Sequence, residues 1–308
     1  MRLRRLPDVQ IMPLHRVFPL AVIVLALSLV AASTGEARLV RDQLGREVLV
    51  PDNPERVVSL APSITEIVFA LGEGHRLKGV TQHCDFPPEA ESLPKVGSFV
   101  HPDLERLAAL KPDLCLVTRD GNSRDPMERL EALKIPVYVV NPKYLNTVME
   151  ALLEIGGLLN AGAKAQGLAN DMHERIERVK SCVTRAKQRP KVFFQVGIVP
   201  IVSVGTHTFI HELITTAGGH NLAEGSIPYP RFSREQVLAL EPEVIIITSM
   251  TRGQAFEQVK DEWSRWDSLP AVRNRRIHVV ESNVFDRPSM RLADGLEILA
   301  RLIHPELF

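Results

Sequence analysis

Runs of apolar residues alternate along the chain with segments of helical periodicity. Residues 114–118 (LCLVT) and 244–248 (VIIIT) are almost wholly apolar, which indicates strands that are buried on both faces. Each run follows a segment with apolar residues at helical spacing, 104–113 and 234–243, in which the helix stops at a proline. Buried strands that alternate with helices are typical of parallel sheets covered on both sides. The pattern therefore predicts the α/β class with doubly wound sheets.

The same plan occurs twice. Residues 66–77 and 212–222 each read as a helix closed by glycine, and each precedes one of the two helix–strand units. The first copy is longer, because it also contains residues 82–101. Long loops on a sheet scaffold often carry binding residues, so this stretch is a candidate ligand loop. We therefore predict two lobes of similar plan; chance similarity between two helix–strand units is the alternative.

The segment between the two copies is predicted to be helical. Apolar residues recur at steps of three and four over residues 145–159 and again over 165–186. A continuous helix over roughly 163–188 would join the lobes stiffly, so we expect limited opening and closing on ligand. The predicted organisation is a signal peptide (1–37), an N-terminal α/β lobe (38–144), a helical linker with the backbone helix (145–189) and a C-terminal α/β lobe (190–308).

The N-terminal residues have the pattern of an export signal. Arginines precede an uncharged apolar run over residues 18–32, which ends in small residues. The run is shorter than the roughly 20 residues that span a bilayer. We expect cleavage near Ala37 and a free periplasmic protein, since no cysteine follows the run as a lipid attachment site. An uncleaved anchor is the alternative.

The charge balance and the cysteine positions argue against two classes of protein, those that bind nucleic acid and those built on a zinc site. The chain has 37 Lys+Arg and 37 Asp+Glu, and this balance argues against nucleic acid as a partner. Cys84, Cys115 and Cys182 lie far apart without the spacing of a zinc site, and they permit one disulfide at most. Cys115 lies within an apolar run, which favours a buried hydrophobic role.

An enzyme is the rival class. The sequence has no GxSxG, no P-loop, no HExxH and no GxGxxG that opens a βαβ unit. Ser59 and Ser63 near Glu66 do not specify a catalytic triad, because nothing in the sequence places them together. We therefore expect neither catalysis nor a catalytic cofactor.

Several segments of the chain carry a family resemblance: residues 42–50 (DQLGREVLV), 54–72 (PERVVSLAPSITEIVFALG), 85–88 (DFPP), 104–113 and 232–242 (FSREQVLALEP). Together they resemble the helical-backbone class of periplasmic binding proteins, and its corrinoid-binding members most. The resemblance implies two doubly wound parallel-sheet lobes joined by a single long backbone helix, with a ligand cleft between them. It also implies a monomer that delivers a metal chelate, a corrinoid such as cobalamin or cobinamide, to the membrane subunits of an ABC importer. The same role for haem or a ferric siderophore is the alternative.

The resemblance also implies ligand-binding residues. The family places its corrinoid between aromatic side chains of the two lobes, and this chain has Phe99 and Tyr229 where cobalamin-binding members have tryptophan. Phe86 belongs to the matching loop. His83 stands at an aromatic pocket position, where its imidazole could ligate the metal or form a hydrogen-bonding wall.

Polar candidates follow in the last lobe and at a strand end. Residues 282–288 match a family segment that closes over the ligand, and its candidates are Asn283, Asp286 and Arg287. Asn283 replaces an acid of the family, which leaves the ligand open. Arg119 and Asn122 follow a predicted strand, where α/β sheets usually bind ligands.

Glu105 and Glu235 occupy corresponding positions in the two copies. In the family, this pair of acids meets arginines of the importer, one lobe to each subunit. Exposed ion pairs contribute about 0–1 kcal/mol each, so docking should be weak and transient. The alternative is that both are solvated acids in the first turn of a helix, favoured by the helix dipole.

Overall fold

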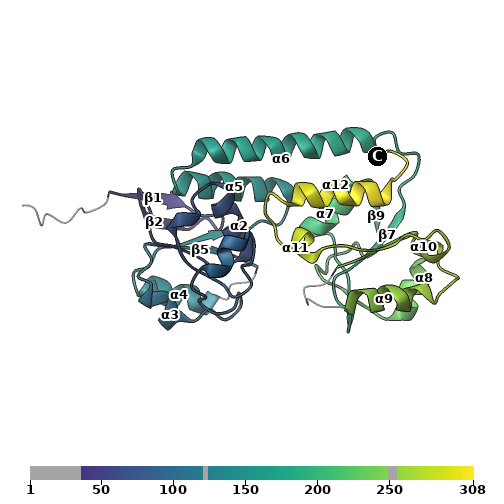
Figure 1. Cartoon of the computed structure of the whole chain (residues 1–308), viewed down its shortest axis with the longest axis horizontal. Coiled ribbons are helices and arrows are strands. Elements are labelled where there is room, and N and C mark those ends of the chain that lie inside the picture. Colours follow the sequence, from purple (N-terminus) through teal and green to yellow (C-terminus); the bar gives the residue numbers. More distant parts are fainter. Residues whose placement is uncertain (1–35, 121–123, 249–254) are drawn as a thin grey trace, which may run out of the picture. The chain divides into compact units, whose positions relative to one another are not determined.

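The structure is a computed structural model that describes residues 36–120, 124–248 and 255–308. Residues 1–35 of the predicted signal peptide therefore lie outside the described residues, and so does Asn122. An antiparallel hairpin of β1 (Ala37–Arg41) and β2 (Glu47–Pro51) precedes the parallel sheet of the first lobe and packs on its core through Val48 and Val50 (Figure 1).

Each lobe contains a parallel four-stranded sheet. The first has the order β4-β3-β5-β6 and the second the order β12-β11-β7-β9. Numbered by chain order within its own lobe, the first sheet reads 2-1-3-4, and so does the second when it is read from β9 to β12, so the predicted repetition of one plan is confirmed. The strands are β3 (Val57–Ser59), β4 (Leu77–Val80), β5 (Leu114–Thr118), β6 (Val137–Val140), β7 (Lys191–Gln195), β9 (His220–Asn221), β11 (Val244–Ile247) and β12 (Ile277–Val279). A short antiparallel pair, β8 (Ile201–Val202) and β10 (Arg231–Phe232), lies apart from the sheets.

Helices cover both faces of each sheet, as the apolar strands predict. Alternate residues of a strand enter different cores: Leu116 packs with α2 and α5, whereas its neighbour Val117 packs with α3 and α4. In the second lobe, the neighbouring strand residues Phe194 and Phe193 likewise enter different cores. The helices are α2 (Pro62–Ala70), α3 (Leu104–Ala109), α4 (Arg124–Ala132), α5 (Leu145–Leu158), α7 (Phe209–Thr216), α8 (Arg234–Leu240), α9 (Ala255–Ser264), α10 (Pro270–Arg273), α11 (Ser282–Phe285) and α12 (Leu292–Ile303), with 3-10 turns at Gly74–Arg76 and Pro88–Ser92.

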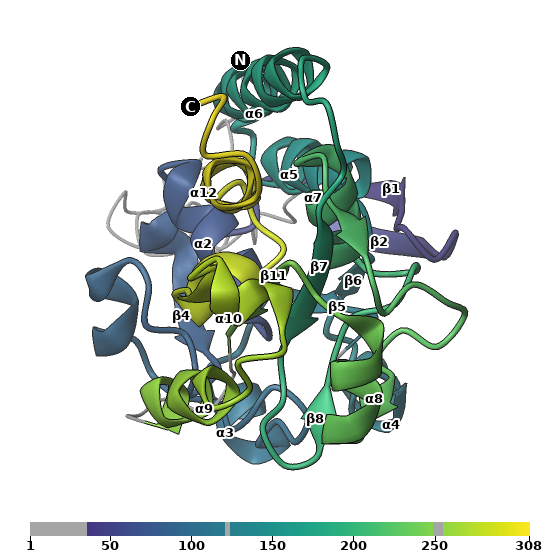
Figure 2. The same cartoon turned by 90° about the vertical axis from the view of Figure 1, so that its right-hand side faces the viewer.

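A long helix, α6 (Gly162–Val183), joins the two lobes. Its first half supplies Ala165 and Ala169 to the core of the first lobe, and its second half supplies Ile176 and Val179 to that of the second. The helix α5 also enters both cores and lies beside α6 (Figures 1 and 2). The α6 helix ends earlier than the predicted residue 188, because the chain after Val183 continues in tight turns before Pro190.

Within the part of the chain that the structure describes, no helix is both long enough and apolar enough to cross a membrane.

Candidate functional site

The candidate ligand loop is anchored by a buried cysteine. Cys84, at 1% exposure, lies 3.2 Å from the Oγ1 of Thr65 on α2 and 3.1 Å from that of Thr81. The Nζ of Lys95 donates to the Cys84 carbonyl over 2.9 Å. Because these contacts fix the loop from beneath, the flanking side chains of His83 and Phe86 are left exposed. The three cysteines are free, and burial raises the pKa of the Cys115 thiol to about 12.

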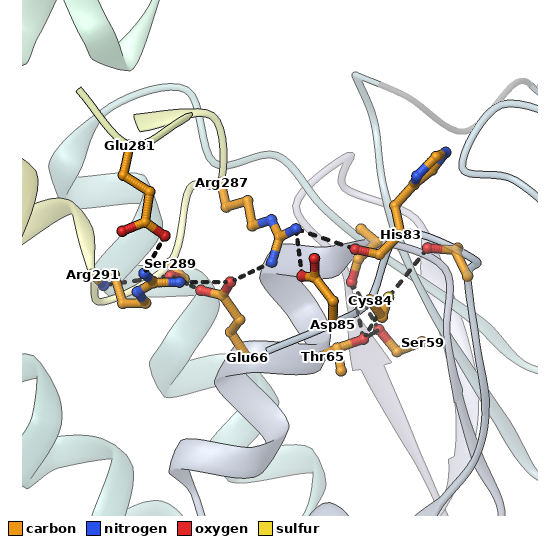
Figure 3. A network of polar contacts seen from close by, with 12 residues as sticks. Ser59, Thr65, Glu66, His83, Cys84, Asp85, Glu281, Arg287, Ser289 and Arg291 are labelled. Carbon is orange, nitrogen blue, oxygen red and sulfur yellow. Dashed lines mark hydrogen bonds and ion pairs between the residues drawn. The ribbon is translucent and has the colours of Figure 1, made fainter. Parts of the chain in front are cut away.

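Glu66 of α2 is the centre of a polar network between the lobes (Figure 3). Its carboxylate is almost fully buried and forms a 3.0 Å ion pair with Arg287 and a 3.3 Å ion pair with Arg291. The hydroxyl of Ser289 donates to the other carboxylate oxygen over 2.6 Å. All three partners belong to the segment that connects α11 with α12, so this segment of the second half of the chain is bound to the first lobe.

Arg287 connects Glu66 to the candidate ligand loop. Its Nη2 lies 2.7 Å from Asp85 Oδ1 and donates to the His83 carbonyl over 3.2 Å. Its side chain is only 9% exposed, and its charge is balanced by the carboxylates of Glu66 and Asp85. In Figure 3 the His83 carbonyl faces Arg287, while the imidazole points away from the network.

Arg291 contacts the same loop through an aromatic ring. Its guanidinium lies 4.1 Å from the ring centroid of Phe86, which is the geometry of a cation–π interaction. Phe86 nevertheless remains 42% exposed. Two arginines that bind Glu66 therefore also contact the loop that carries His83 and Phe86.

Tyr229 is the exposed aromatic of the second lobe. Its side chain is 54% exposed, and its pKa is raised by partial burial and by the negative charges of Asp120 and Asp286. Asp120 follows β5 of the first lobe, whereas Asp286 follows α11, so carboxylates from both halves of the chain lie near this phenol. Burial also raises the pKa of Asp286 to about 7, against the lowering effect of Arg287.

The remaining predicted ligand residues occupy varied environments. Phe99 is half-buried and packs against the core of the first lobe. Asn283 is half-buried within α11, and Arg119 is exposed directly after β5, with its backbone N–H bonded to the carbonyl of Val140. Of the predicted ligand residues, Arg287 and His83 are brought into direct contact, because the Arg287 guanidinium donates to the His83 carbonyl.

Glu105 and Glu235 hold equivalent places in the two lobes. Each is exposed and stands two residues after an N-cap, Asp103 in α3 and Ser233 in α8. Hydrogen bonds from its own backbone N–H and from Ser233 lower the pKa of Glu235. Both helices lie on the side of the lobes away from α6 (Figures 1 and 2).

The sequence reasoning missed Glu66, Asp85, Ser289 and Arg291 as site residues. Glu66 had a signal of its own: it is the one acid in the apolar helix PSITEIVFA, and a buried acid requires a partner. In the described ranges, no group of three or more His, Cys, Asp or Glu residues is arranged to hold a metal ion.

Two lobes of one topology, joined by helices that enter both cores and by a buried ionic network, define a two-lobed solute-binding protein. The chain belongs to the periplasmic binding protein family, whose model matches residues 57–284. It is a substrate-binding protein of the kind that serves ABC importers, and not an enzyme.

The names of similar proteins include two ligands, vitamin B12 and heme. The chain is 32% identical over 244 residues to the vitamin B12-binding protein of Pectobacterium atrosepticum, which covers 78% of this chain and 85% of the relative. The solved periplasmic vitamin B12 binding protein BtuF of Vibrio cholerae is 29% identical with a TM-score of 0.72, over 83% of this chain and 98% of the other. A periplasmic heme-binding protein from Pseudomonas aeruginosa is 25% identical with a TM-score of 0.75, over 83% and 94%.

Proposed function

We propose that this protein captures a corrinoid, cobalamin or cobinamide, between its two lobes and delivers it to the membrane subunits of an ABC importer. The similarity to vitamin B12-binding proteins over 78% of this chain is the observation that carries the proposal. The proposed organisation keeps the predicted boundaries: an export signal over residues 1–37, lobes over 38–144 and 190–308, and the helical linker between them. The exported protein acts as a periplasmic monomer.

Exposed aromatic residues on both lobes support a flat, largely apolar ligand. Phe86 is 42% exposed on the first lobe and Tyr229 is 54% exposed on the second. Aromatic side chains bury on the order of 150–250 Å² each, and at roughly 25 cal/mol/Å² two covered rings would supply several kcal/mol. The predicted stacking pair was Phe99 and Tyr229; because Phe99 is half-buried against the core, this proposal gives its place on the first lobe to the exposed Phe86 and keeps Tyr229 on the second.

The charges near Tyr229 favour an amide-rich ligand over an anionic one. The negative charge of Asp120 acts on the Tyr229 hydroxyl, so a ligand carboxylate placed there would be repelled. Because the pKa of Asp286 is about 7, its carboxyl group is protonated in a large fraction of molecules near neutral pH and can then donate a hydrogen bond. Corrinoid amide side chains can pair with Asp286, Asn283 and Arg119 as acceptors or donors.

Haem is the second candidate, and His83 is the residue that favours it. The exposed imidazole of His83 lies on the candidate ligand loop and is free to turn toward a metal, although it now lies 3.1 Å from the Gln82 amide nitrogen. A heme-binding protein is also among the similar solved structures. Axial ligation by His83 would distinguish this candidate from simple stacking of a corrinoid.

Transfer to the importer is assigned to Glu105 and Glu235. Their equivalent positions after the N-caps of α3 and α8, both exposed, support one contact per lobe with basic residues of the importer. Such contacts contribute about 0–1 kcal/mol each in water, which suits a carrier that must dissociate after delivery.

Calorimetric titration of the purified protein tests the ligand assignment. Cobalamin, cobinamide, haem and a ferric siderophore are each added to the same preparation. We expect binding heat with a corrinoid and little with the siderophore. Heat with haem alone, accompanied by loss of binding in His83→Ala, would transfer the assignment to haem, and no heat with either corrinoid would end the present proposal.

A further inference from the structure

The two lobes are linked by an ionic network that also contacts the candidate ligand loop. Glu66 on α2 is 2% exposed, and its ionic partners Arg287 and Arg291 come from the other half of the chain. The loop at residues 83–86 lies beside Arg287, which contacts Asp85 and the His83 carbonyl (Figure 3). The same arginines therefore contact both α2 and the loop.

The donors of Arg287 are already used within the protein. One Nη group pairs with Glu66 at 3.0 Å, and the other contacts Asp85 at 2.7 Å and the His83 carbonyl at 3.2 Å. With its side chain only 9% exposed, Arg287 has little surface left for a ligand. To bind a ligand directly, this guanidinium would first have to break its ion pair with Glu66, and an unpaired buried carboxylate is costly.

Arg291 completes the arrangement on the aromatic side of the loop. It pairs with Glu66 at 3.3 Å while its guanidinium stacks 4.1 Å from the centroid of the Phe86 ring. Phe86 therefore has a cation packed on its ring and still exposes 42% of its surface. The orientation of the exposed part depends on where Arg291 is held, and Glu66 holds it.

We propose that Arg287 and Arg291 are positioning residues, which hold the loop at residues 83–86 in its ligand-competent place through the buried carboxylate of Glu66. This inference rests on the proposed function, since it assigns these arginines to the same site. It replaces the direct ligand contact predicted for Arg287 with an indirect one. The benefit is pre-organisation, because a loop that is fixed before binding loses less conformational freedom when the ligand arrives.

Hydrogen–deuterium exchange of the ligand-free protein tests the positioning role. We expect Arg287→Met to speed amide exchange in peptides that cover residues 82–90 by about tenfold or more, because the loop opens more often. Arg287→Lys keeps the charge beside Glu66 but lacks the fork that reaches the loop, so the same peptides should again exchange faster in a variant that retains the fold. Unchanged exchange of the loop in both variants would overturn the proposal.

Arg175→Met is the matched control. Arg175 is 20% exposed and pairs with Asp294 and Glu297, so it joins α6 to α12 through a comparable ion pair but does not contact the loop. We expect this variant to leave exchange over residues 82–90 as in the wild type. Equal acceleration in the control would indicate general loosening and count against a specific role for Arg287.

Titration with cyanocobalamin connects the loop to binding. We expect Kd to rise about tenfold in Arg287→Lys and to stay unchanged in Arg175→Met. Faster loop exchange with unaltered Kd would refute the link between loop position and binding. If the wild type binds neither cyanocobalamin nor cobinamide, the corrinoid assignment fails, whereas the exchange experiment still decides whether these arginines position the loop.

Discussion

Glu66 and Arg287 form a 3.0 Å ion pair although 221 residues separate them in the sequence. Their side chains are 1% and 9% exposed, so water screens neither charge well. A buried pair of this kind contributes little net stability over an apolar replacement, but removing one partner leaves the other charge unpaired. The pair therefore determines how the segment before α12 attaches to the first lobe.

Glu66→Ala should lower the free energy of unfolding by about 3–5 kcal/mol, because it leaves Arg287 and Arg291 near a cavity without their shared carboxylate. Urea denaturation followed by circular dichroism measures the loss. Arg287→Met should cost less in the Glu66→Ala background than in the wild type, since the interaction is already gone. Equal costs in both backgrounds would mean that the two residues are not energetically coupled.

The stability of the protein should depend on the ionisation of Asp286. Burial raises the pKa of this carboxyl from its ordinary 3.8 to about 7, so between these values the folded protein keeps a proton that the unfolded chain has lost. The contribution of Asp286 to stability therefore falls as pH rises from about 4 to 7 and is constant above that range. Asp286→Asn removes this dependence.

Melting temperatures at pH 5 and pH 8 provide the measurement. The variant Asp286→Asn should gain at least about 2 °C relative to the wild type on going from pH 5 to pH 8. Asp267→Asn, which removes an exposed carboxylate from the same lobe, is the control. Its melting temperature should change between pH 5 and pH 8 by as much as that of the wild type. A constant difference between Asp286→Asn and the wild type would show that the carboxyl does not titrate in this range.

The aromatic residues proposed to stack on the ligand should each contribute to affinity. If a corrinoid covers on the order of 60 Å² of a ring, then at about 25 cal/mol/Å² the loss on Phe86→Ala or Tyr229→Ala is about 1.5 kcal/mol, or roughly tenfold in Kd. Tyr229→Trp should bind more tightly, because the larger ring offers more area. Calorimetry with cyanocobalamin checks these changes.

Phe308→Ala is a matched control for the aromatic substitutions. Phe308 is 40% exposed and also has an arginine over its ring, Arg301 at 5.7 Å, but it lies at the C-terminus. Its replacement should leave Kd unaltered. If Phe86→Ala and Phe308→Ala behave alike, Phe86 does not contact the ligand.

Much of the fold could be predicted from local pattern. The apolar runs that contain Leu116 and Ile246 became central strands, because a strand buried on both faces needs apolar residues at every position. The repeat also marked Glu66 and Glu212 as equivalent, and both make contacts across the fold: Glu212 accepts from the Leu145 backbone N–H over 2.6 Å. The sequence pattern indicated the positions of these acids without their partners.

The site was harder to predict, because its contacts join distant segments. Nothing in the local pattern around Arg287 distinguishes an arginine that faces a ligand from one whose charge is satisfied by Glu66, which depends on the folded distance alone. Phe99 shows the same limit, since a half-buried aromatic at the edge of a core has the same sequence signature as one that lines a cleft. Local pattern also places helix ends only to within a few residues: the end of α6 was predicted at residue 188 and lies at Val183.

Docking to the importer should be lost when the charges at the equivalent helix starts are reversed. Glu105→Arg combined with Glu235→Arg places cations where basic residues of the importer would approach, so like-charge repulsion replaces attraction. Ligand affinity should stay as in the wild type, because neither residue contacts the network around Glu66. The measurement is stimulation of ATP hydrolysis by the reconstituted importer, together with calorimetry for the ligand.

Each single reversal should reduce stimulation in part, since each lobe contributes one contact, and the effect should weaken as salt is raised. Glu174→Arg, an exposed acid on α6 and therefore on the side away from α3 and α8, should stimulate like the wild type. If the double reversal stimulates normally, the two glutamates are ordinary first-turn acids favoured by the helix dipole. If it loses ligand binding as well, the substitutions act through the fold, and the docking surface must lie elsewhere.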